Sequence, residues 1–190
     1  MGRISEIKNA VVLFAIFTII LGIVYPLVIT GISQLAFPEQ ANGNLIKENG
    51  VVVGSQLIGQ NFSSPQYFHG RPSAIDYNSS TSSGSNLGPD NQKLIDNVAQ
   101  NMANVKGENN LSSNSDVPAD LVETSASGLE AYIYVDSALI QVPRIAHARN
   151  ISESEVKNIV KDNEEFPFFG IGTPIVNVLK LNIALDKLKK

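Results

Sequence analysis

A long uncharged run near the N-terminus limits how this chain can fold. No Asp, Glu, Lys, Arg or His occurs between Lys8 and Glu39, and the run is rich in Ile, Val, Leu and Phe. A helix needs about 20 apolar residues to cross the roughly 30 Å hydrocarbon core of a bilayer, and this run is longer. A cleaved signal peptide would have an apolar region of only about 7 to 15 residues, followed by a small-x-small cleavage site. We therefore predict a retained signal-anchor helix over residues 9–38.

Flanking charges predict the orientation of this helix. Two cations, Arg3 and Lys8, precede the run, whereas the first charge after it is Glu39. Cytoplasmic flanks of membrane helices carry an excess of Lys and Arg. The prediction is therefore a cytoplasmic N-terminus (1–8) and a single soluble domain outside the cell membrane (39–190).

Composition narrows the classes of partner. The chain has no cysteine, so disulfides play no part in its fold, and its formal net charge is −4. An acidic chain without a basic cluster is a poor nucleic-acid binder, because phosphate contacts dominate that affinity. The two histidines, His69 and His147, are far apart and belong to no H-E-x-x-H helix, so no metal site is expected. The acidic charge is compatible with a cation-rich or neutral partner surface, and membrane lipid is the expected partner of the apolar helix. Pro26, inside the apolar run, should kink the helix, which is tolerated where neighbouring membrane helices satisfy the freed carbonyl group.

The region after the apolar run begins with a hairpin signal and a helical pattern. Asn49 and Gly50 stand between two apolar-rich runs, the strongest short indication of a β-hairpin. Further on, apolar residues recur at helical spacing, and we expect a helix that begins at Pro89 and ends at Gly107.

The C-terminal third predicts two short helices, a strand and a last helix. Asp136 could cap the first helix, and Ser152 with Glu155 forms the S-x-x-E capping box of the second. A β-branched run, 175–178, then predicts a strand, followed by a short helical end. The whole pattern indicates the α+β class: one N-terminal transmembrane helix followed by a single small mixed α/β soluble domain with an antiparallel sheet.

Residues 60–91 are crowded with Gly, Pro, Ser and Asn, which is typical of a loop. Aromatic residues are interleaved through this loop, however, and a disordered linker would be poor in aromatics. We therefore expect an ordered loop whose rings anchor it to the domain or to a partner. The candidate partner-interface residues, with the membrane proline, are Pro26, Tyr67, Phe68, His69, Arg71 and Tyr77.

Catalytic signals are few. Ser154 and Lys157 match the S-x-x-K pattern, but they lie on a charged helix without its companion motifs, and Ser5 with Lys8 repeats the match. Neither the P-loop nor the G-x-G-x-x-G fingerprint occurs. The stretch "SSGSNLGPDN", 82–91, could form an anion-binding nest at the start of a helix. The better reading is a helix start that satisfies its own N–H groups, because an acidic residue already lies in its first turn.

Several segments together carry a family resemblance. The segments "VYPLVITGISQLAFPEQANGNLI", "VGSQLIGQNFSSPQYFHGRPSAIDYN", "SSGSNLGP", "SASGL", "QVPRIAHARN" and "VNVLKLNIALDKL" occur in family order over nearly the whole chain. In this respect the chain resembles the C-subunit family of Kdp-type potassium-transporting ATPases. The family usually has a glycine where this chain has Ser83, which raises the question of strain if that position needs a positive φ.

The resemblance implies an accessory, non-catalytic subunit of an ATP-driven potassium uptake complex. Its implied partners are a channel-like potassium-binding subunit, an ATP-hydrolysing subunit and a small single-span subunit. The family is described as a catalytic chaperone that raises the ATP affinity of the hydrolysing subunit. No tightly bound cofactor is expected, but ATP shared with that subunit is possible. The candidate nucleotide-binding residues are then Asn86, Gln141 and Arg144.

Alternatives remain at this point. Gln141 and Arg144 could instead cap or pair on a helix kinked by Pro143, as part of a solvated polar face. A domain outside the membrane also cannot touch cytoplasmic ATP, so an effect on ATP affinity would then be indirect. The chain could also be an extracytoplasmic binding or sensor module tethered by its anchor, with the loop from Tyr67 to Tyr77 as its contact surface. An anchored enzyme is disfavoured by the missing catalytic constellation.

Overall fold

The structure is a computed structural model that describes residues 2–188. Contacts divide the chain into two compact units, Met1–Leu45 and Ile46–Lys190. The α+β class is confirmed: an N-terminal apolar helix is followed by a domain of helices and small antiparallel sheets.

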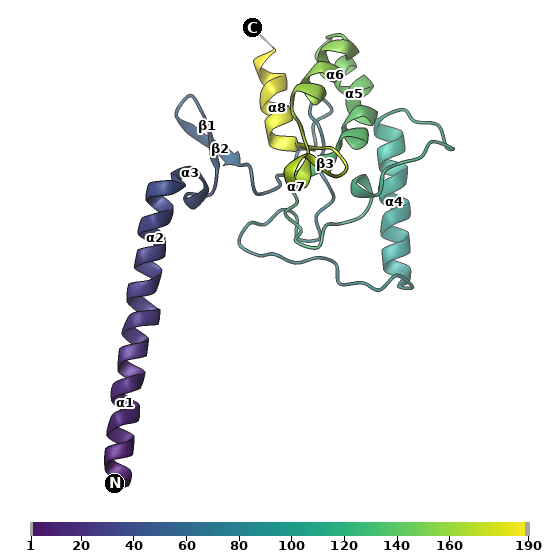
Figure 1. The fold of residues 1–190 in the computed structure, drawn as a ribbon. Helices are drawn as coiled ribbons and strands as arrows, with labels where there is room; N and C mark the ends of the chain where they lie inside the picture. The colour runs from purple at the N-terminus through teal and green to yellow at the C-terminus, as the bar shows by residue number, and fades with distance from the viewer. Residues whose placement is uncertain (1, 189–190) are drawn as a thin grey trace. The chain divides into compact units, whose positions relative to one another are not determined.

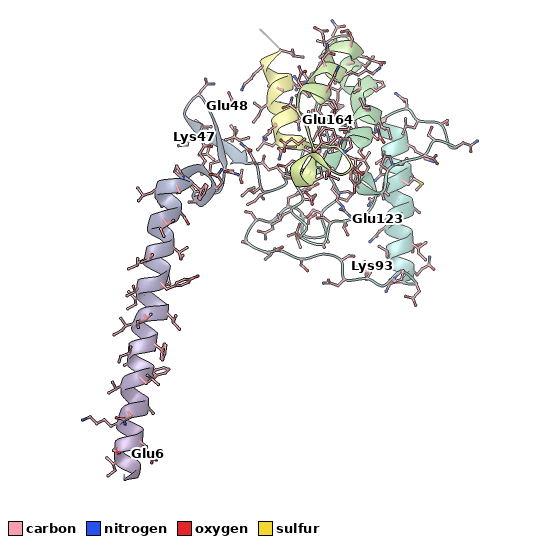
Figure 2. The ribbon with its side chains drawn as sticks, viewed as in Figure 1. Glu6, Lys47, Glu48, Lys93, Glu123 and Glu164 are labelled. Atoms are coloured by element: carbon pink, nitrogen blue, oxygen red, sulfur yellow. The ribbon has the colours of Figure 1, made fainter. Side chains whose placement is uncertain are left out.

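The first unit is dominated by one long apolar helix. It consists of α1 (Arg3–Ile19), a π-helical turn (Ile20–Val24) and α2 (Tyr25–Ala36). Its side chains project outward around the axis (Figure 2). By length and composition, the segment from Ile4 to Ala36 could cross a membrane. A short helix, α3 (Pro38–Ala41), follows.

Pro26 is accommodated by the π-helical turn that precedes it. Proline has no N–H, and in a regular α-helix its ring clashes with the carbonyl group four residues earlier. Just before it, the Tyr25 N–H donates to the carbonyl oxygen of Ile20, five residues back, which widens the turn. The irregularity that the sequence predicts at Pro26 therefore takes the form of a π-bulge within the helix.

The predicted hairpin is confirmed, and the division between the two units falls after the first residue of its first strand. Strands β1 (Leu45–Glu48) and β2 (Val51–Ser55) pair with each other. Asn49 and Gly50 form the turn, both with left-handed φ, of 51° and 81°. This is the conformation that a two-residue hairpin turn requires.

A second antiparallel sheet has three short strands in the order β3–β5–β4, of which β3 is labelled in Figure 1. These strands are β3 (Tyr132–Tyr134), β4 (Glu164–Glu165) and β5 (Ile175–Asn177). The helices of the domain are α4 (Gln92–Glu108), the 3₁₀ turn η2 (Ala119–Leu121), α5 (Val135–Arg149), α6 (Glu153–Asp162), α7 (Pro167–Gly170) and α8 (Val178–Lys187). The hydrophobic core lies among α5, α6, α8 and this sheet, and the ring of Phe68 enters it from a loop. Its other members include Ile133, Val142, Ile145, Val156, Val160, Val176, Leu181 and Leu185.

Two predicted helix starts are wrong. Helix α4 begins at Gln92, because Asn91 is its N-cap and accepts from the Lys93 N–H, whereas Pro89 precedes the helix. Asp136 does not cap α5 but lies in its first turn. Among the described residues, no side chain caps α5. Instead, the buried Asp120 carboxylate accepts the N–H of Tyr134, the residue just before the helix, at 2.8 Å.

The other boundaries agree more closely. The capping box of Ser152 and Glu155 at the start of α6 is confirmed. Helix α4 continues through Gly107 to Glu108, one residue beyond the predicted end. The β-branched run forms β5 over three residues, and its last member, Val178, already begins α8.

Candidate functional site: the clamped aromatic loop

The aromatic loop, residues 60–77, has almost no secondary structure but is fixed by two side-chain carboxamides. Asn182 of α8 accepts from the Phe68 N–H at 2.8 Å and donates to the Phe68 carbonyl oxygen at 3.0 Å. Gln141 of α5 does the same for His69, at 2.8 and 3.1 Å. Each carboxamide thus takes the place of a neighbouring strand, and the main-chain N–H and carbonyl groups of two consecutive loop residues are both satisfied.

Arg144 holds the segment just before these residues. Its guanidinium donates to the carbonyl oxygens of Pro65 (2.6 Å) and Tyr67 (3.0 Å), to Asn109 Oδ1 (3.0 Å) and to Gln141 Oε1 (2.8 Å). Burial lowers the pKa of Arg144, and the nearby Glu108 acts in the opposite direction. The cation is stabilised by oxygen dipoles of the protein, which is the requirement for burying a charge.

A second arginine fixes the loop from the other side. Arg149 donates to the Gln66 carbonyl oxygen at 2.7 Å and pairs with Asp186 at 2.7 Å. Its guanidinium also lies over the Tyr67 ring, 4.9 Å from the centroid, and the Tyr67 hydroxyl donates to Asp186 at 3.0 Å. Burial, with help from Asp186, raises the pKa of Tyr67. The exposed edge of the loop is therefore also held in one position.

His69 links the loop to the end of α4. Its Nδ1 lies 3.2 Å from the Glu108 carboxylate and its Nε2 lies 3.1 Å from the Ser64 carbonyl oxygen. Burial lowers the pKa of His69 and the Arg144 charge adds to this, against the raising effects of Ser64 and Glu108. Among residues 2–188, no cluster of three or more His, Asp or Glu side chains could hold a metal ion.

The candidate interface residues differ in their accessibility. Phe68 is 0% exposed and is part of the core, so a partner cannot contact it while the domain is folded. Arg71 is half-buried, and its side chain donates to the Glu123 carbonyl oxygen at 3.0 Å. Tyr77 is also half-buried, its hydroxyl donates to the Arg71 carbonyl oxygen, and burial raises its pKa. Tyr67 and His69 are half-buried at the surface of the loop, and Pro26 lies in the apolar helix.

The candidate nucleotide residues fall into two places. Gln141 and Arg144 contact each other within α5, but both are buried, so the expectation of a solvated polar face is wrong. Asn86 is exposed in a different loop, where its side chain donates to Ser83 Oγ at 3.4 Å. The structure therefore brings Gln141 and Arg144 together but not Asn86, and the polar atoms of Gln141 and Arg144 bind the aromatic loop.

The stretch 82–91 is held by residues 125–128. The Ser83 N–H donates to the Ser127 carbonyl oxygen at 3.0 Å, and a Cβ on Gly84 would lie 3.0 Å from the carbonyl oxygen of Ala126. The left-handed position of the stretch is Asn86, with φ 54°, whereas Ser83 is not left-handed. Serine in place of the usual glycine therefore adds no strain there.

Sequence reasoning missed Asn182, Arg149 and Asp120. Asn182 had a visible signal, since it is an uncharged polar residue within the apolar pattern "VLKLNIALDKL". Arg149 and Asp120 had none, because their partners lie far away in the chain.

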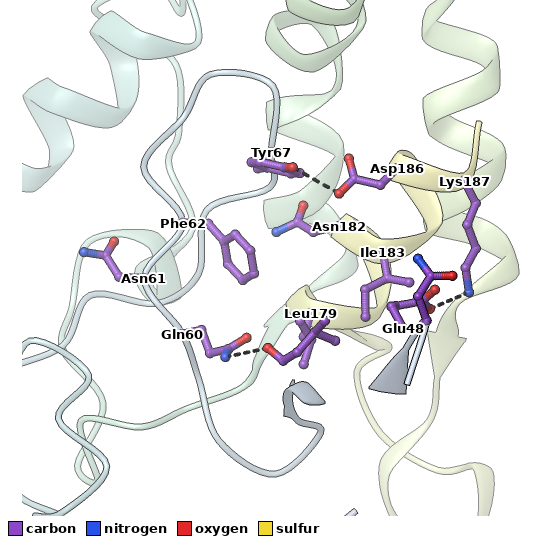
Figure 3. Close-up of a pocket in the computed structure, with 12 residues that line it drawn as sticks. Glu48, Gln60, Asn61, Phe62, Tyr67, Leu179, Asn182, Ile183, Asp186 and Lys187 are labelled. Carbon is purple, nitrogen blue, oxygen red and sulfur yellow. Dashed lines mark hydrogen bonds and ion pairs between the residues drawn. The ribbon is translucent and has the colours of Figure 1, made fainter. Parts of the chain in front are cut away.

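A pocket of about 610 Å³ lies between the hairpin, the aromatic loop and α8 (Figure 3). Its apolar wall is formed by Val53, Phe62, Leu179 and Ile183. Polar groups line the rest, including Gln60, which donates to the Val53 carbonyl oxygen at 3.1 Å. The ion pair of Glu48 with Lys187, at 2.9 Å, joins the hairpin to the end of α8.

Comparison with known proteins gives a match over nearly the whole chain. The family model described as "KdpC: K+-transporting ATPase, c chain" matches residues 7–187. A potassium-transporting ATPase KdpC subunit of Rhodopseudomonas palustris (strain BisB18) is 45% identical over 201 residues, which cover 98% of this chain and 100% of the relative. The KdpC subunit of Mycobacterium tuberculosis (strain ATCC 25618 / H37Rv) is 47% identical over 186 residues, covering 96% of this chain and 98% of the relative. That of Bradyrhizobium diazoefficiens is 46% identical over 199 residues, covering 97% and 98%.

Proposed function

Because the chain belongs to the KdpC family of potassium-transporting ATPase c chains, we propose that it is a non-catalytic subunit needed to assemble its complex. The observation that carries this proposal is the family match over residues 7–187, which includes both the apolar helix and the domain. The aromatic loop adds support, because the arginines Arg144 and Arg149 of α5 are engaged in holding it to the domain. Groups held in this way are suited to presenting a fixed surface to partners.

The proposed partners are the channel-like potassium-binding subunit, the ATP-hydrolysing subunit and the small single-span subunit. A single apolar N-terminal helix supports a single-pass membrane protein. We place the domain outside the membrane, because the cations Arg3 and Lys8 precede the helix. In that position the domain meets its partners on the outer side of the complex.

We further propose that any rise in the ATP affinity of the hydrolysing subunit is indirect. At least four donor–acceptor contacts of the Arg144 guanidinium are made within this chain. The Gln141 carboxamide is likewise engaged by His69. A nucleotide would have to displace these contacts, each of which is costly to leave unmade in a buried site. The effect on ATP would then act through the conformation of the complex.

The side of the membrane is the measurement that tests this proposal. Single cysteines placed at Ser82 and Asn110, both exposed in a chain that has no cysteine, give two labelling sites. In the full complex, an impermeant maleimide should label both in intact cells, which supports an indirect effect. Labelling only after lysis would place the domain in the cytoplasm and contradict the proposal.

The pocket of Figure 3 favours a second candidate function, that of a tethered binding or sensor module. A volume of about 610 Å³ with an apolar wall and a polar rim is typical of ligand sites. Co-purification separates the two functions. A lone module should leave the membrane as a monomer after mild detergent extraction, whereas a subunit should bring its partners in fixed stoichiometry.

A further inference from the structure

One end of the three-stranded sheet carries exposed apolar residues. Glu165, Ile175 and Tyr134 form a row across the three strands. After β4 the chain passes Phe166, forms the short helix α7 and returns through Ile171 to β5. We call Tyr134, Phe166 and Ile171 the apolar tip.

The base of the tip is tied to the start of α5. The carbonyl oxygen of Pro174 accepts from the Val135 N–H at 3.1 Å, directly beside Tyr134. The loop therefore starts from and returns to paired strands, and its position at the end of the sheet is set by the sheet register.

All three residues of the tip are exposed. Tyr134 is 44% exposed, Phe166 52% and Ile171 77%. No charged residue occurs between Glu165 and Lys180 in the sequence. Tyr134 and Glu165 both pair with Ile175, Phe166 follows Glu165, and Ile171 lies four residues before Ile175, so the strand register places the three residues near one end of the sheet. Neighbouring exposed apolar groups are typical of interaction surfaces.

A small recess beside the tip has the composition of an interface centre. It measures about 160 Å³, and Arg71, Tyr132 and Tyr134 are among its lining residues. Tyrosine and arginine are enriched among the residues that carry most of the binding energy at protein interfaces. The recess and the tip share Tyr134, so they form one continuous surface.

The charges around the tip indicate which partner it fits. Glu164 and Glu165 precede it, Asp136 follows Tyr134, and Glu130 lines the recess. Of these, Glu165 is paired with Lys180 at 2.7 Å. The recess is also lined by Arg71 and the buried Asp120, so carboxylates outnumber cations around the tip. Segments that bind lipid surfaces combine apolar groups with lysine and arginine, because the anionic lipids of a bilayer surface attract cations. An acidic border instead favours a protein surface whose apolar recess is edged by basic residues.

We propose that the apolar tip docks into an apolar, basic-edged recess on another subunit of the transporter complex. This inference rests on the proposed function, since it requires that the chain is part of a complex. It adds a specific surface, at the β4–β5 end of the domain, that makes the contact. Arg71, a residue of the aromatic loop, lines the recess beside the tip.

Substitution of the exposed tip residues tests whether the tip binds another subunit. We expect Ile171→Asp and Phe166→Ser each to weaken retention of the other subunits by about tenfold or more when the complex is washed in mild detergent. Ile95→Asp is the matched control, because Ile95 is 50% exposed on α4, and it should leave retention unchanged. If the unaltered chain brings no subunits, the proposed function fails. If it brings them and both tip variants retain them equally, only the tip proposal fails.

A fluorescent probe separates a protein partner from the alternatives. A single cysteine at Ile171, labelled with an environment-sensitive dye, should shift its emission to the blue in the complete complex. The full-length chain alone, in detergent or in vesicles of phosphatidylethanolamine and phosphatidylglycerol, should show no shift. A shift in those vesicles would identify a lipid surface, and a shift in detergent would identify a second copy; either result overturns the proposal. The same dye at Ile95 controls for general changes.

Discussion

Single residues of this domain replace secondary structure as the means of holding a loop. Asn182 and Gln141 each bind both main-chain groups of one loop residue, and Arg144 binds the carbonyl groups just before them. A buried backbone group that loses its partner costs a large part of its desolvation energy. The loop is therefore as sensitive to these three side chains as a strand is to its neighbour.

Arg144→Ala should lower the free energy of unfolding by about 3 kcal/mol, because it removes several charge-assisted hydrogen bonds from buried oxygens. Urea unfolding of the full-length chain in a non-ionic detergent, followed by tyrosine fluorescence, measures the change. His147→Ala, on the exposed side of the same helix, should stay within about 0.5 kcal/mol. A variant that raises the KM for ATP of the complex without loss of stability would instead identify Arg144 as a nucleotide ligand.

His69 should make the domain less stable in mild acid. Its pKa is lowered in the folded state by burial, so the unfolded chain binds the proton first as the pH falls below about 6.5. The free energy of unfolding should then decrease from that pH down to the folded-state pKa and be fully retained above neutrality. Unfolding midpoints between pH 5 and 7.5 measure this, and His69→Gln should reduce the dependence. Greater stability in acid would show that the pair with Glu108 raises the pKa instead.

At the scale of elements, local signals and long-range partners decide different boundaries. The hairpin and the α6 capping box are encoded within a few residues, and both occur where the sequence predicts them. Helix α5 begins where Asp120 meets Tyr134, and these two residues are 14 positions apart in the chain. Such a start cannot be located from a window of neighbouring residues.

Two glycines should respond to alanine in opposite ways. Gly50 has φ 81° in the hairpin turn, so Gly50→Ala should destabilise the hairpin by about 1 kcal/mol and speed its amide exchange about fivefold. Gly107 lies inside α4 with open space around it, so Gly107→Ala should stabilise that helix by about 0.5–1 kcal/mol and slow its exchange. Hydrogen exchange read by mass spectrometry measures both. Faster exchange in both variants would contradict the assigned backbone conformations.

At the scale of the whole molecule, one long apolar helix accompanies a domain held by dispersed polar contacts. The π-bulge before Pro26 leaves the helix without its regular hydrogen-bond ladder at that point. Inside a bilayer such a gap is tolerated where neighbouring helices satisfy the freed groups. Pro26 is therefore a candidate for packing against another subunit.

Pro26→Ala should leave membrane retention unchanged and weaken the complex. Alanine restores a regular helix and so removes the π-bulge against which a neighbouring helix would pack. We expect the binding free energy of the complex to weaken by about 1 kcal/mol, which corresponds to about fivefold less retention of the other subunits. Carbonate extraction measures membrane retention, and co-purification measures the complex. Leu27→Ala, at the next position of the same helix, is the control. Unchanged co-purification of both variants would show that Pro26 has no role in packing.

The sequence by itself determined the apolar helix, the hairpin, the capping box and the α+β class. Each of these depends on composition, spacing or turn chemistry among residues that are close together in the chain. The family resemblance likewise followed from linear segments. Only the tertiary structure decided that Phe68 belongs to the core and that Gln141 and Arg144 are buried clamps. It also showed that the Asp120 carboxylate holds the residue just before α5. A polar side chain carries no sign of its partner in the local sequence, because burial and hydrogen bonding depend on what the fold brings beside it.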